Sequence, residues 1–276
     1  AEKLRDAGGD YGTYVGDAYS PYVVDRFRGP YGEFLDAFVW AKVDAAGVPI
    51  TVKAGRHAVA WGESLMLSGN THSVAYAQVP LDLAKGFATP GVEAKELFRP
   101  VASLSAQAQL ARTLSVAAQA FFEWQPYLYP EGATFLGGSD AAFRGPDGTC
   151  PPTQPTCPTY TKNGGISWPS SVGEWGAAVR WRPDVLDTTF GLYYRRLTDK
   201  FAAVLVSTNP GGQGPFSPGI PSPLQYRQYY GEGIDLVGVS VARQILGASV
   251  GAEASVRHDM PLLAQSPGFA GAPAPP

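Results

Sequence analysis

The sequence is poor in charge and in the residue types from which most catalytic and metal sites are built. Only 16 % of its 276 residues are charged, and it has three histidines and two cysteines. It contains no G-x-S-x-G, H-E-x-x-H, C-x-x-C, P-loop or G-x-G-x-x-G motif, and the histidines lie far apart along the chain. We therefore expect a protein that is not an enzyme and that holds no cofactor and no metal.

The chain also lacks a basic run and a long apolar helix. Its 21 basic and 24 acidic side chains are spread along the sequence, which makes nucleic acid a poor partner. The longest uncharged segment, Phe201 to Tyr226, contains five Pro and four Gly and cannot remain helical across a membrane. No Met and no basic-then-apolar leader stands at Ala1, so we expect the numbering to start after a removed signal peptide or inside a larger protein.

What the sequence does contain is alternation with a period of two. Apolar and polar residues alternate cleanly over 101–110, 113–124 and 248–257, which is typical of strands with one apolar and one polar face. Five weaker stretches, 34–43, 50–58, 174–182, 188–197 and 233–243, follow the same rule. The sequence thus predicts about eight strands and makes a helical bundle a poor alternative.

The connections between these strands alternate strictly between short and long. Residues 44–49, 111–112, 183–187 and 244–246 form short links, whereas 59–99, 125–173 and 198–232 form long loops. In an up-and-down sheet this series places every short turn at one end and every long loop at the other. That asymmetry is typical of an antiparallel transmembrane β-barrel in the outer membrane of a Gram-negative bacterium, with the lipid bilayer as its partner.

The same order of connections places both ends of the chain on the side of the long loops. Residues 1–276 are therefore expected to form a single β-barrel domain or, more specifically, four hairpins of a larger barrel. Trp40, Trp124, Trp175 and Trp181 lie near predicted strand ends, where an aromatic girdle is expected; ordinary packing in the core of a sandwich is the alternative.

The two cysteines, Cys150 and Cys157, lie in the Pro-rich stretch GTCPPTQPTCPT. This spacing favours a disulfide that closes a small ring in an oxidising compartment. Two unrelated free thiols are the alternative.

The densest group of polar and aromatic residues, Arg56, His57, Trp61 and Glu63, opens the first long loop. We expect Arg56 and Glu63 to pair and anchor this loop, and His57 to titrate near neutral pH. Whether the pair narrows a pore or only fixes the loop stays open at this point, as does whether the short helical pieces expected in 73–87 and 91–98 fill the lumen or cap it from outside.

Polar side chains of both signs are expected to face the lumen, which indicates no strong ion selectivity. They are Asp36, Lys42, Lys53, Gln107, Gln109, Gln119, Glu123, Glu174, Arg180, Arg182, Asp235, Glu253 and Arg257.

The stretch GRHAVAWGES, from Gly55 to Ser64, resembles a motif of the proteobacterial outer-membrane family known as domain of unknown function 1302 (DUF1302). The family pattern is similar to G-R-Q, three residues, then W-G-E-S, so His57 stands where Gln is usual. PGVEAKELFRPV from Pro90, FGLYYRR from Phe190 and IDLVGVS from Ile234 also resemble family segments, and the likeness extends over about residues 31–260.

The resemblance implies an outer-membrane β-barrel, a full chain roughly twice as long, and a part in transport. Members are often encoded beside a periplasmic lipoprotein and an RND-type exporter, which suggests that lipids, sterols or other hydrophobic solutes are moved. Our prediction is a porin-like, non-enzymatic channel or transport protein that passes or helps to export a small or hydrophobic solute. A soluble secreted β-sandwich or barrel that binds a ligand through its long loops is the alternative, and an outer-membrane hydrolase is a third possibility.

Overall fold

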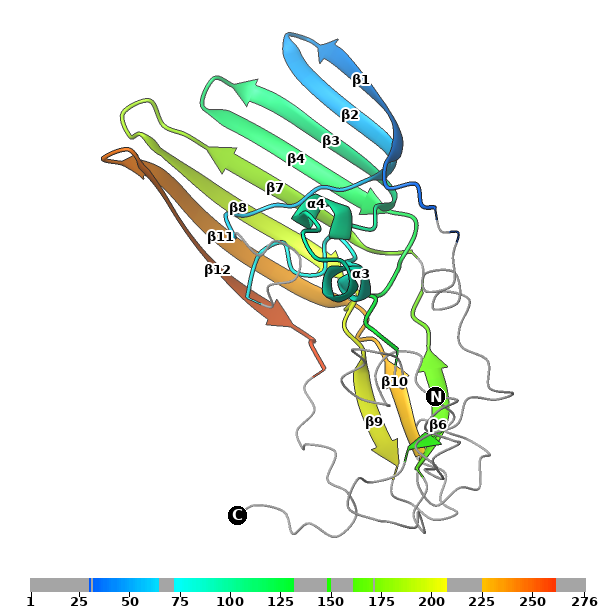
Figure 1. Ribbon diagram of the computed structural model, residues 1–276. Coiled ribbons are helices and arrows are strands. Elements are labelled where there is room, and N and C mark those ends of the chain that lie inside the picture. The colour runs from blue at the N-terminus through cyan, green and yellow to red at the C-terminus, as the bar shows by residue number, and fades with distance from the viewer. Residues whose placement is uncertain are drawn as a thin grey trace, which may run out of the picture.

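The computed structural model describes residues 30, 32–64, 72–131, 148–149, 161–170, 172–207 and 225–261. Within them, eight strands form one antiparallel sheet in which each strand lies next to its neighbours in the sequence (Figure 1). The strands are β1 (Ala37–Ala45), β2 (Val48–His57), β3 (Val101–Ala111), β4 (Leu114–Phe121), β7 (Trp175–Trp181), β8 (Thr188–Leu197), β11 (Ile234–Ile245) and β12 (Ala248–His258). The predicted up-and-down arrangement of eight antiparallel strands is confirmed.

Short turns and long connections leave opposite ends of this sheet, as the sequence predicts. The four hairpins close at one end, and connections 58–100, 122–174 and 198–233 leave from the other. In two hairpins both central residues have positive φ, namely Ala46 (54°) with Gly47 (82°) and Leu246 (50°) with Gly247 (83°). Positive φ at both positions is what a type I′ turn requires, and the twist of that turn matches the twist of the flanking strands.

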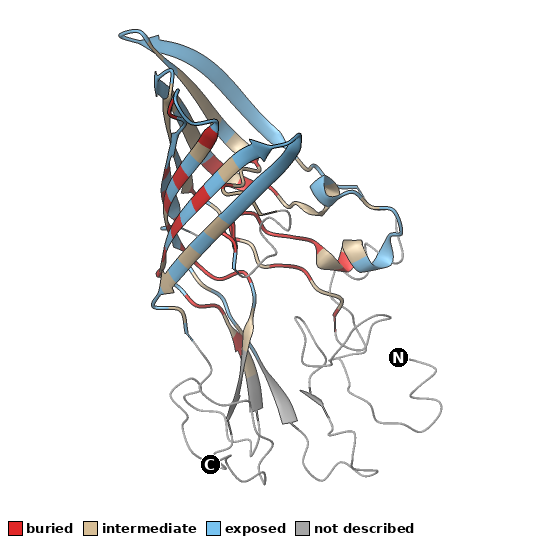
Figure 2. Ribbon diagram, turned by 90° about the vertical axis from the view of Figure 1, so that its left-hand side faces the viewer, coloured by how far each residue is buried: buried red, intermediate tan, exposed pale blue. Residues whose placement is uncertain are grey.

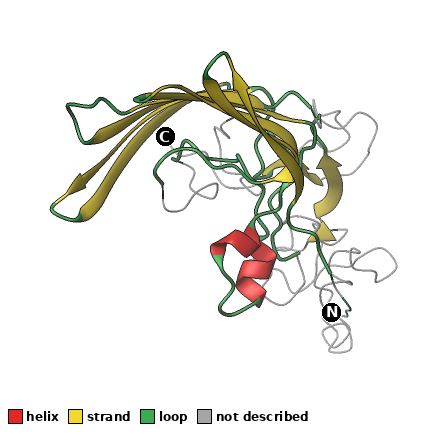
Figure 3. Ribbon diagram, turned by 90° about the horizontal axis from the view of Figure 1, so that it is seen from above, coloured by secondary structure: helices red, strands yellow, loops and turns green. Residues whose placement is uncertain are grey.

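The sheet is curved and, in the described part of the chain, open. Seen from above, its strands form an arc, and the two short helices lie on the concave side (Figure 3). Strands β1 and β12 are the outermost strands, and they do not pair with each other.

The long connections hold a second, smaller sheet and two short helices. Strands β5 (Gly148–Thr149), β6 (Thr161–Ser167), β10 (Gln225–Tyr229) and β9 (Ala203–Ser207) form that sheet, which the sequence did not predict. The helices are α3 (Leu83–Ala88) and α4 (Ala94–Leu97), shorter than the predicted pieces 73–87 and 91–98. Helix α3 begins after Asp82, whose side chain accepts a hydrogen bond from the Lys85 amide (2.8 Å). None of the described helices is long and apolar enough to cross a membrane.

The convex face of the sheet is apolar from one edge to the other. Because successive side chains point to opposite faces, the strand register aligns residues of like character into rows across the sheet. One row crosses all eight strands without a polar side chain: Val43, Ile50, Ala108, Val116, Val179, Leu192, Val239 and Ala254. Leu192 is 54 % exposed and Val239 is 51 % exposed. Figure 2 shows the alternation of buried and exposed residues along the strands.

Aromatic pairs lie on the convex face near both ends of β7 and β8. The rings of Trp175 and Tyr194 are 5.0 Å apart on the side of the long connections, and those of Trp181 and Phe190 are 5.7 Å apart on the side of the turns. Trp175 and Trp181 thus lie at strand ends on the exposed face, in the positions expected of a girdle.

Two other tryptophans do not belong to that set. Trp40 lies opposite Lys53 in the register, which places it on the concave face. Trp124 lies beyond the end of β4 and is buried, with its ring 4.6 Å from that of Tyr230. For these two the girdle prediction is wrong, because closeness to a strand end does not determine the face.

Candidate functional site: a segment packed on the concave face

The first long connection folds back onto the concave face of the sheet. We call its residues 58–64 and 72–82 the inner segment. Its central part is almost fully buried although it belongs to no helix or strand, and only short turns organise its backbone, such as the Gln78 amide donating to the Ala75 carbonyl (2.9 Å). The residues of the segment with at most 2 % exposure are Ser73, Val74, Ala75, Tyr76, Ala77, Gln78 and Asp82. Residues 73–82, the first part of the predicted helical pieces, therefore lie on the concave face, and whether they fill a lumen stays a prediction.

Glycines in the sheet make room for the large side chains of this segment. A Cβ added at Gly176 in β7 would lie 2.8 Å from the ring of Trp61, and one added at Gly238 in β11 would lie 2.5 Å from Val74 Cγ2. Both distances are too short for any side chain to be added without a shift of the segment. The fit between segment and sheet therefore depends on the missing side chains at these two positions.

Two charged side chains of the sheet hold the backbone of the segment. The carboxylate of Glu253 in β12 accepts hydrogen bonds from the amides of Glu63 (2.8 Å) and Val74 (3.2 Å). The guanidinium of Arg195 in β8 donates through Nη1 to the carbonyls of Val74 (3.0 Å) and Tyr76 (2.6 Å). Because Arg195 is 2 % exposed, these contacts also satisfy a charge that water hardly reaches.

The side chain of Tyr76 attaches the segment to the loop side of the sheet. Its hydroxyl donates to Asp199 Oδ1 (2.5 Å), and the guanidinium of Arg257 lies 4.7 Å from its ring centre. Burial and the nearby Asp199 carboxylate raise the pKa of Tyr76, because both disfavour the phenolate. Tyr76 therefore stays a neutral hydrogen-bond donor.

A second set of contacts holds Trp61 and the residues beside it. The Trp61 amide donates to Gln78 Oε1 (2.9 Å), and Gln78 Nε2 donates to Gln119 Oε1 in β4 (3.0 Å). The ring of Trp61 stacks on that of Tyr193, with 6.3 Å between centroids. Trp61 thus joins the segment to the middle of the sheet.

A buried ion pair lies beside the segment, where β7 begins and β8 ends. Lys200 Nζ is 2.9 Å and 3.0 Å from the two oxygens of Glu174, and both side chains are at most 5 % exposed. Burial lowers the pKa of Lys200 and the Glu174 carboxylate opposes that effect. The Thr198 amide also donates to Glu174 (2.8 Å), so the carboxylate is well satisfied and fixes the start of the third long connection.

The four residues singled out from the sequence do not form one cluster. Arg56 pairs with Glu123 (2.8 Å), and the predicted pair of Arg56 with Glu63 is wrong. Alternation places Arg56 on the convex side at the end of β2, whereas the chain has turned onto the concave side by Glu63, whose amide faces Glu253. Trp61 is buried in the segment, as described above.

His57 is buried at the end of β2 and faces the concave side. Its Nε2 lies 2.7 Å from Ser105 Oγ and its Nδ1 lies 3.1 Å from the Gly55 carbonyl. An imidazole with its proton on Nδ1 donates to Gly55 and accepts from Ser105, so both contacts are made by a neutral ring. The predicted titration of His57 near neutral pH stays a prediction.

Most of the strand residues expected to face the lumen lie on the concave face, but Asp235 does not. It lies opposite Arg196 and His258 in the register, and Tyr194 donates a hydrogen bond to it (2.8 Å). All four side chains belong to the convex rows, where they mark the end of the apolar band. Cys150 and Cys157, expected to form a disulfide, lie outside the described residues.

Sequence reasoning missed Arg195 and Tyr76, which hold the segment. Alternation along 188–197 could have placed Arg195 on the same face as Gly191 and Tyr193, because these residues are spaced by two. For Tyr76 no local signal exists, since its partner Asp199 lies 123 residues further along the chain.

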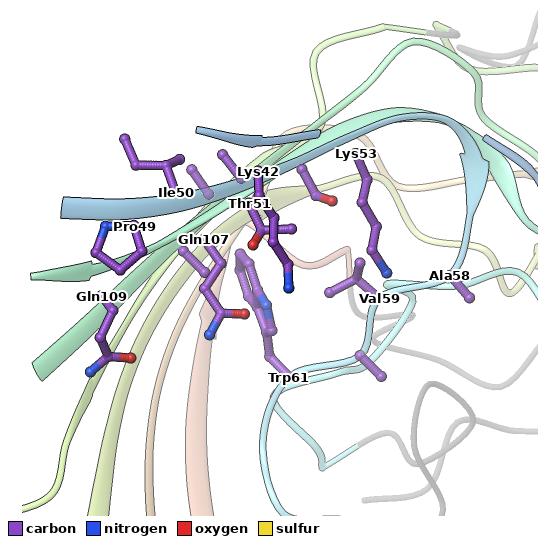
Figure 4. A pocket seen from close by; sticks show the side chains of 15 residues that line it. Lys42, Pro49, Ile50, Thr51, Lys53, Ala58, Val59, Trp61, Gln107 and Gln109 are labelled. Atoms are coloured by element: carbon purple, nitrogen blue, oxygen red, sulfur yellow. The ribbon is translucent and has the colours of Figure 1, made fainter. Parts of the chain in front are cut away.

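A hollow of about 610 Å³ lies beside the segment, on the concave face of β1 to β4. Lys42 and Lys53 point from the sheet toward the part of the chain that carries Val59 and Trp61, and Gln107 points into the same space (Figure 4). No group of three or more His, Cys, Asp or Glu side chains in the described ranges is arranged to hold a metal ion.

A family model described as "Protein of unknown function (DUF1302)" matches residues 5–276, nearly the whole chain. This match agrees with the resemblance seen in GRHAVAWGES. No curated protein and no solved structure matches the chain.

Proposed function

Since the chain belongs to the DUF1302 family, whose description names no activity, we propose its function from the geometry: the eight strands form part of the wall of a β-barrel in the outer membrane of a Gram-negative bacterium. The convex face lies against lipid, and the concave face lines a passage that the inner segment partly fills. The protein passes, or helps to export, a small or hydrophobic solute and performs no chemistry on it.

The row of eight apolar residues across the convex face carries this proposal. Large exposed apolar surfaces are rare on soluble proteins, and here the row is continuous from β1 to β12. In β11 the uncharged stretch runs between Asp235 and Arg243, which spans about 26 Å along the strand and about 20 Å across a membrane at a tilt near 40°. That height is close to the apolar band of outer-membrane barrels, about 25 Å.

The outer edges of β1 and β12 explain why further strands are needed. In lipid each unpaired backbone N–H or C=O group costs several kcal/mol. The unpaired groups along one strand edge together therefore cost at least on the order of the whole stability of a small domain. Neither of these edges is paired within the described sheet. We therefore propose that further strands of the same polypeptide pair with β1 and β12 and close the barrel.

The alternative of a soluble sandwich needs a second layer on the convex face. No described element covers Val179, Leu192 or Val239, which are 37 %, 54 % and 51 % exposed. A hydrolase built on the contact of His57 with Ser105 is also disfavoured. In a Ser-His-Asp site the Nδ1 of the histidine faces a carboxylate that stabilises the imidazolium. In this chain the Nδ1 of His57 instead faces the backbone carbonyl of Gly55.

The proposed partners beyond the lipid bilayer, a periplasmic lipoprotein and an RND-type exporter, rest only on the family resemblance. We propose that these partners deliver the solute and provide the energy for export, because the wall of a passive barrel does neither.

Spin labels inside and outside the apolar band test the proposal. In a full-length variant with all native cysteines changed to serine, a nitroxide is attached at Val239→Cys or, as the matched control, at Leu246→Cys in the exposed turn of the same hairpin. After reconstitution into vesicles, the label at 239 is expected to collide with oxygen and to be shielded from a water-soluble nickel chelate, and the label at 246 to behave in the opposite way. Equal access of the nickel chelate to both labels, or a stable monomer in the aqueous fraction without detergent, would contradict the proposal.

A further inference from the structure

We propose that the hollow beside the inner segment binds the acidic headgroup of an amphipathic molecule. This inference rests on the proposed function and deepens it by naming the chemical class of the solute. It starts from the charge of the lining: two lysines face the hollow, and no acidic side chain lines it.

The two ammonium groups are not neutralised within the described part of the chain. Lys42 Nζ lies 5.8 Å from the ring centre of Trp40, and Lys53 Nζ lies 5.2 Å from that of Phe38, while neither lysine forms an ion pair with a carboxylate. An aromatic ring attracts a cation but leaves its net charge in place. Asp44, two residues beyond Lys42 on the same face of β1, is occupied by the Gly47 amide of the turn (2.8 Å) and does not line the hollow.

Neutral polar groups between the lysines suit the same ligand. Thr51 and Gln107 are directly paired in the register and lie in the row of Lys42, so their side chains share the floor of the hollow. A hydroxyl and an amide next to two ammonium groups supply hydrogen bonds to carboxylate, phosphate or sulfate oxygens. An anion bound here interacts with both ammonium groups and displaces no existing ion pair.

The opposite side of the hollow is apolar and comes from the inner segment. Val59 and Trp61 face the sheet across the space (Figure 4). A volume of about 610 Å³ lies in the range of small-molecule sites. A ligand with one acidic end and one apolar body matches both sides at once, whereas an inorganic anion leaves the apolar side wet and a neutral lipid leaves the lysines unpaired.

Binding of a fluorescent carboxylate tests this assignment. The probe is dansyl-labelled undecanoate, its primary amide is the neutral match, and energy transfer from tryptophan to the dansyl group reports binding to full-length protein in zwitterionic vesicles. The variant K42Q/K53Q removes both charges, K42R/K53R restores them, and K95Q removes the charge of an exposed lysine in α4 as the control. We expect the double glutamine variant to bind the carboxylate at least about tenfold more weakly, and the arginine and Lys95 variants to bind it as the native protein does.

The results separate the two proposals. Native affinity of K42Q/K53Q for the carboxylate, or equal affinity of the native protein for carboxylate and amide, overturns the headgroup site even when the label at position 239 lies in lipid. A label at 239 that lies in water overturns the membrane proposal whatever the probe does, because position 239 is on the other face of the sheet from both lysines.

Discussion

Replacement of Glu253 by alanine removes the carboxylate that holds the inner segment on both sides of residues 65–71. Its oxygens accept hydrogen bonds from the amides of Glu63 (2.8 Å) and Val74 (3.2 Å). A hydrogen bond to a charged group contributes about 1.5–3 kcal/mol. Because the second bond is longer and Glu253 is partly exposed, we take about 2 kcal/mol for the two bonds together. Since about 1.4 kcal/mol is a factor of ten, we expect the released form of the segment to become about 30-fold more populated.

Hydrogen–deuterium exchange in the peptide that spans residues 72–82 measures this release. In the native protein the amides of Val74 and Ala77 are hydrogen-bonded to Glu253 and to the Tyr127 hydroxyl, and we expect slow exchange. The E253A variant is expected to exchange faster across the whole peptide, and E253Q, which keeps one good acceptor oxygen, to lie between. Asp184→Ala serves as the control, because it removes an exposed ion pair with Arg112 at the turn end. Unchanged exchange in E253A would refute the reasoning, since the segment would then be held without this carboxylate.

Two further predictions concern packing and charge. Gly238→Val places a side chain where Val74 Cγ2 lies only 2.5 Å from a single added Cβ, so we expect a loss of about 1–3 kcal/mol of stability and faster exchange in 72–82, and an unchanged protein would contradict the described fit. For Glu123, burial alone raises the pKa of the carboxyl, but the Ala102 amide, the Gln125 amide and the Arg56 charge together lower it. A carboxyl with a lowered pKa stabilises the folded state at pH values above its ordinary pKa, and this stabilisation is lost as the pH falls through the pKa of the folded state. Because the Arg56 side chain is partly exposed, the stabilisation is limited to about 1 kcal/mol. Thermal melts of native protein and E123Q should therefore differ at pH 7, and this difference should shrink as the pH falls below the ordinary carboxyl range; a difference that stays the same from pH 7 down to acid would contradict this role.

The sheet was largely predictable because its rule is local. Each strand has to present one apolar face and one polar face, and residues such as Leu192 and Val239 show it within a few positions of the sequence. The order of short and long connections follows from the same strands by counting. The second sheet was not predictable in this way, because β5 has only two residues and the four strands of this sheet come from two different long connections.

The path of the inner segment depends on partners far away in the sequence, and there the predictions were poorest. Arg56 and Glu63 are seven positions apart, yet the chain reverses face between them, so that one reaches Glu123 and the other Glu253. The register likewise decides that Asp235 belongs to the convex face, although its own strand alone does not reveal which face is outward.

The contact between Glu63 and Glu253 also has a consequence for the order of folding. It joins residues 190 positions apart, whereas the sheet itself grows by hairpins between neighbouring strands. Local hairpins form with a small entropic cost, while a contact of such long range is made only when the intervening strands are already in place. We therefore expect the β2–β3 connection to be held from β4 and β8 first and to be fixed completely only when β12, with Glu253, has joined the sheet.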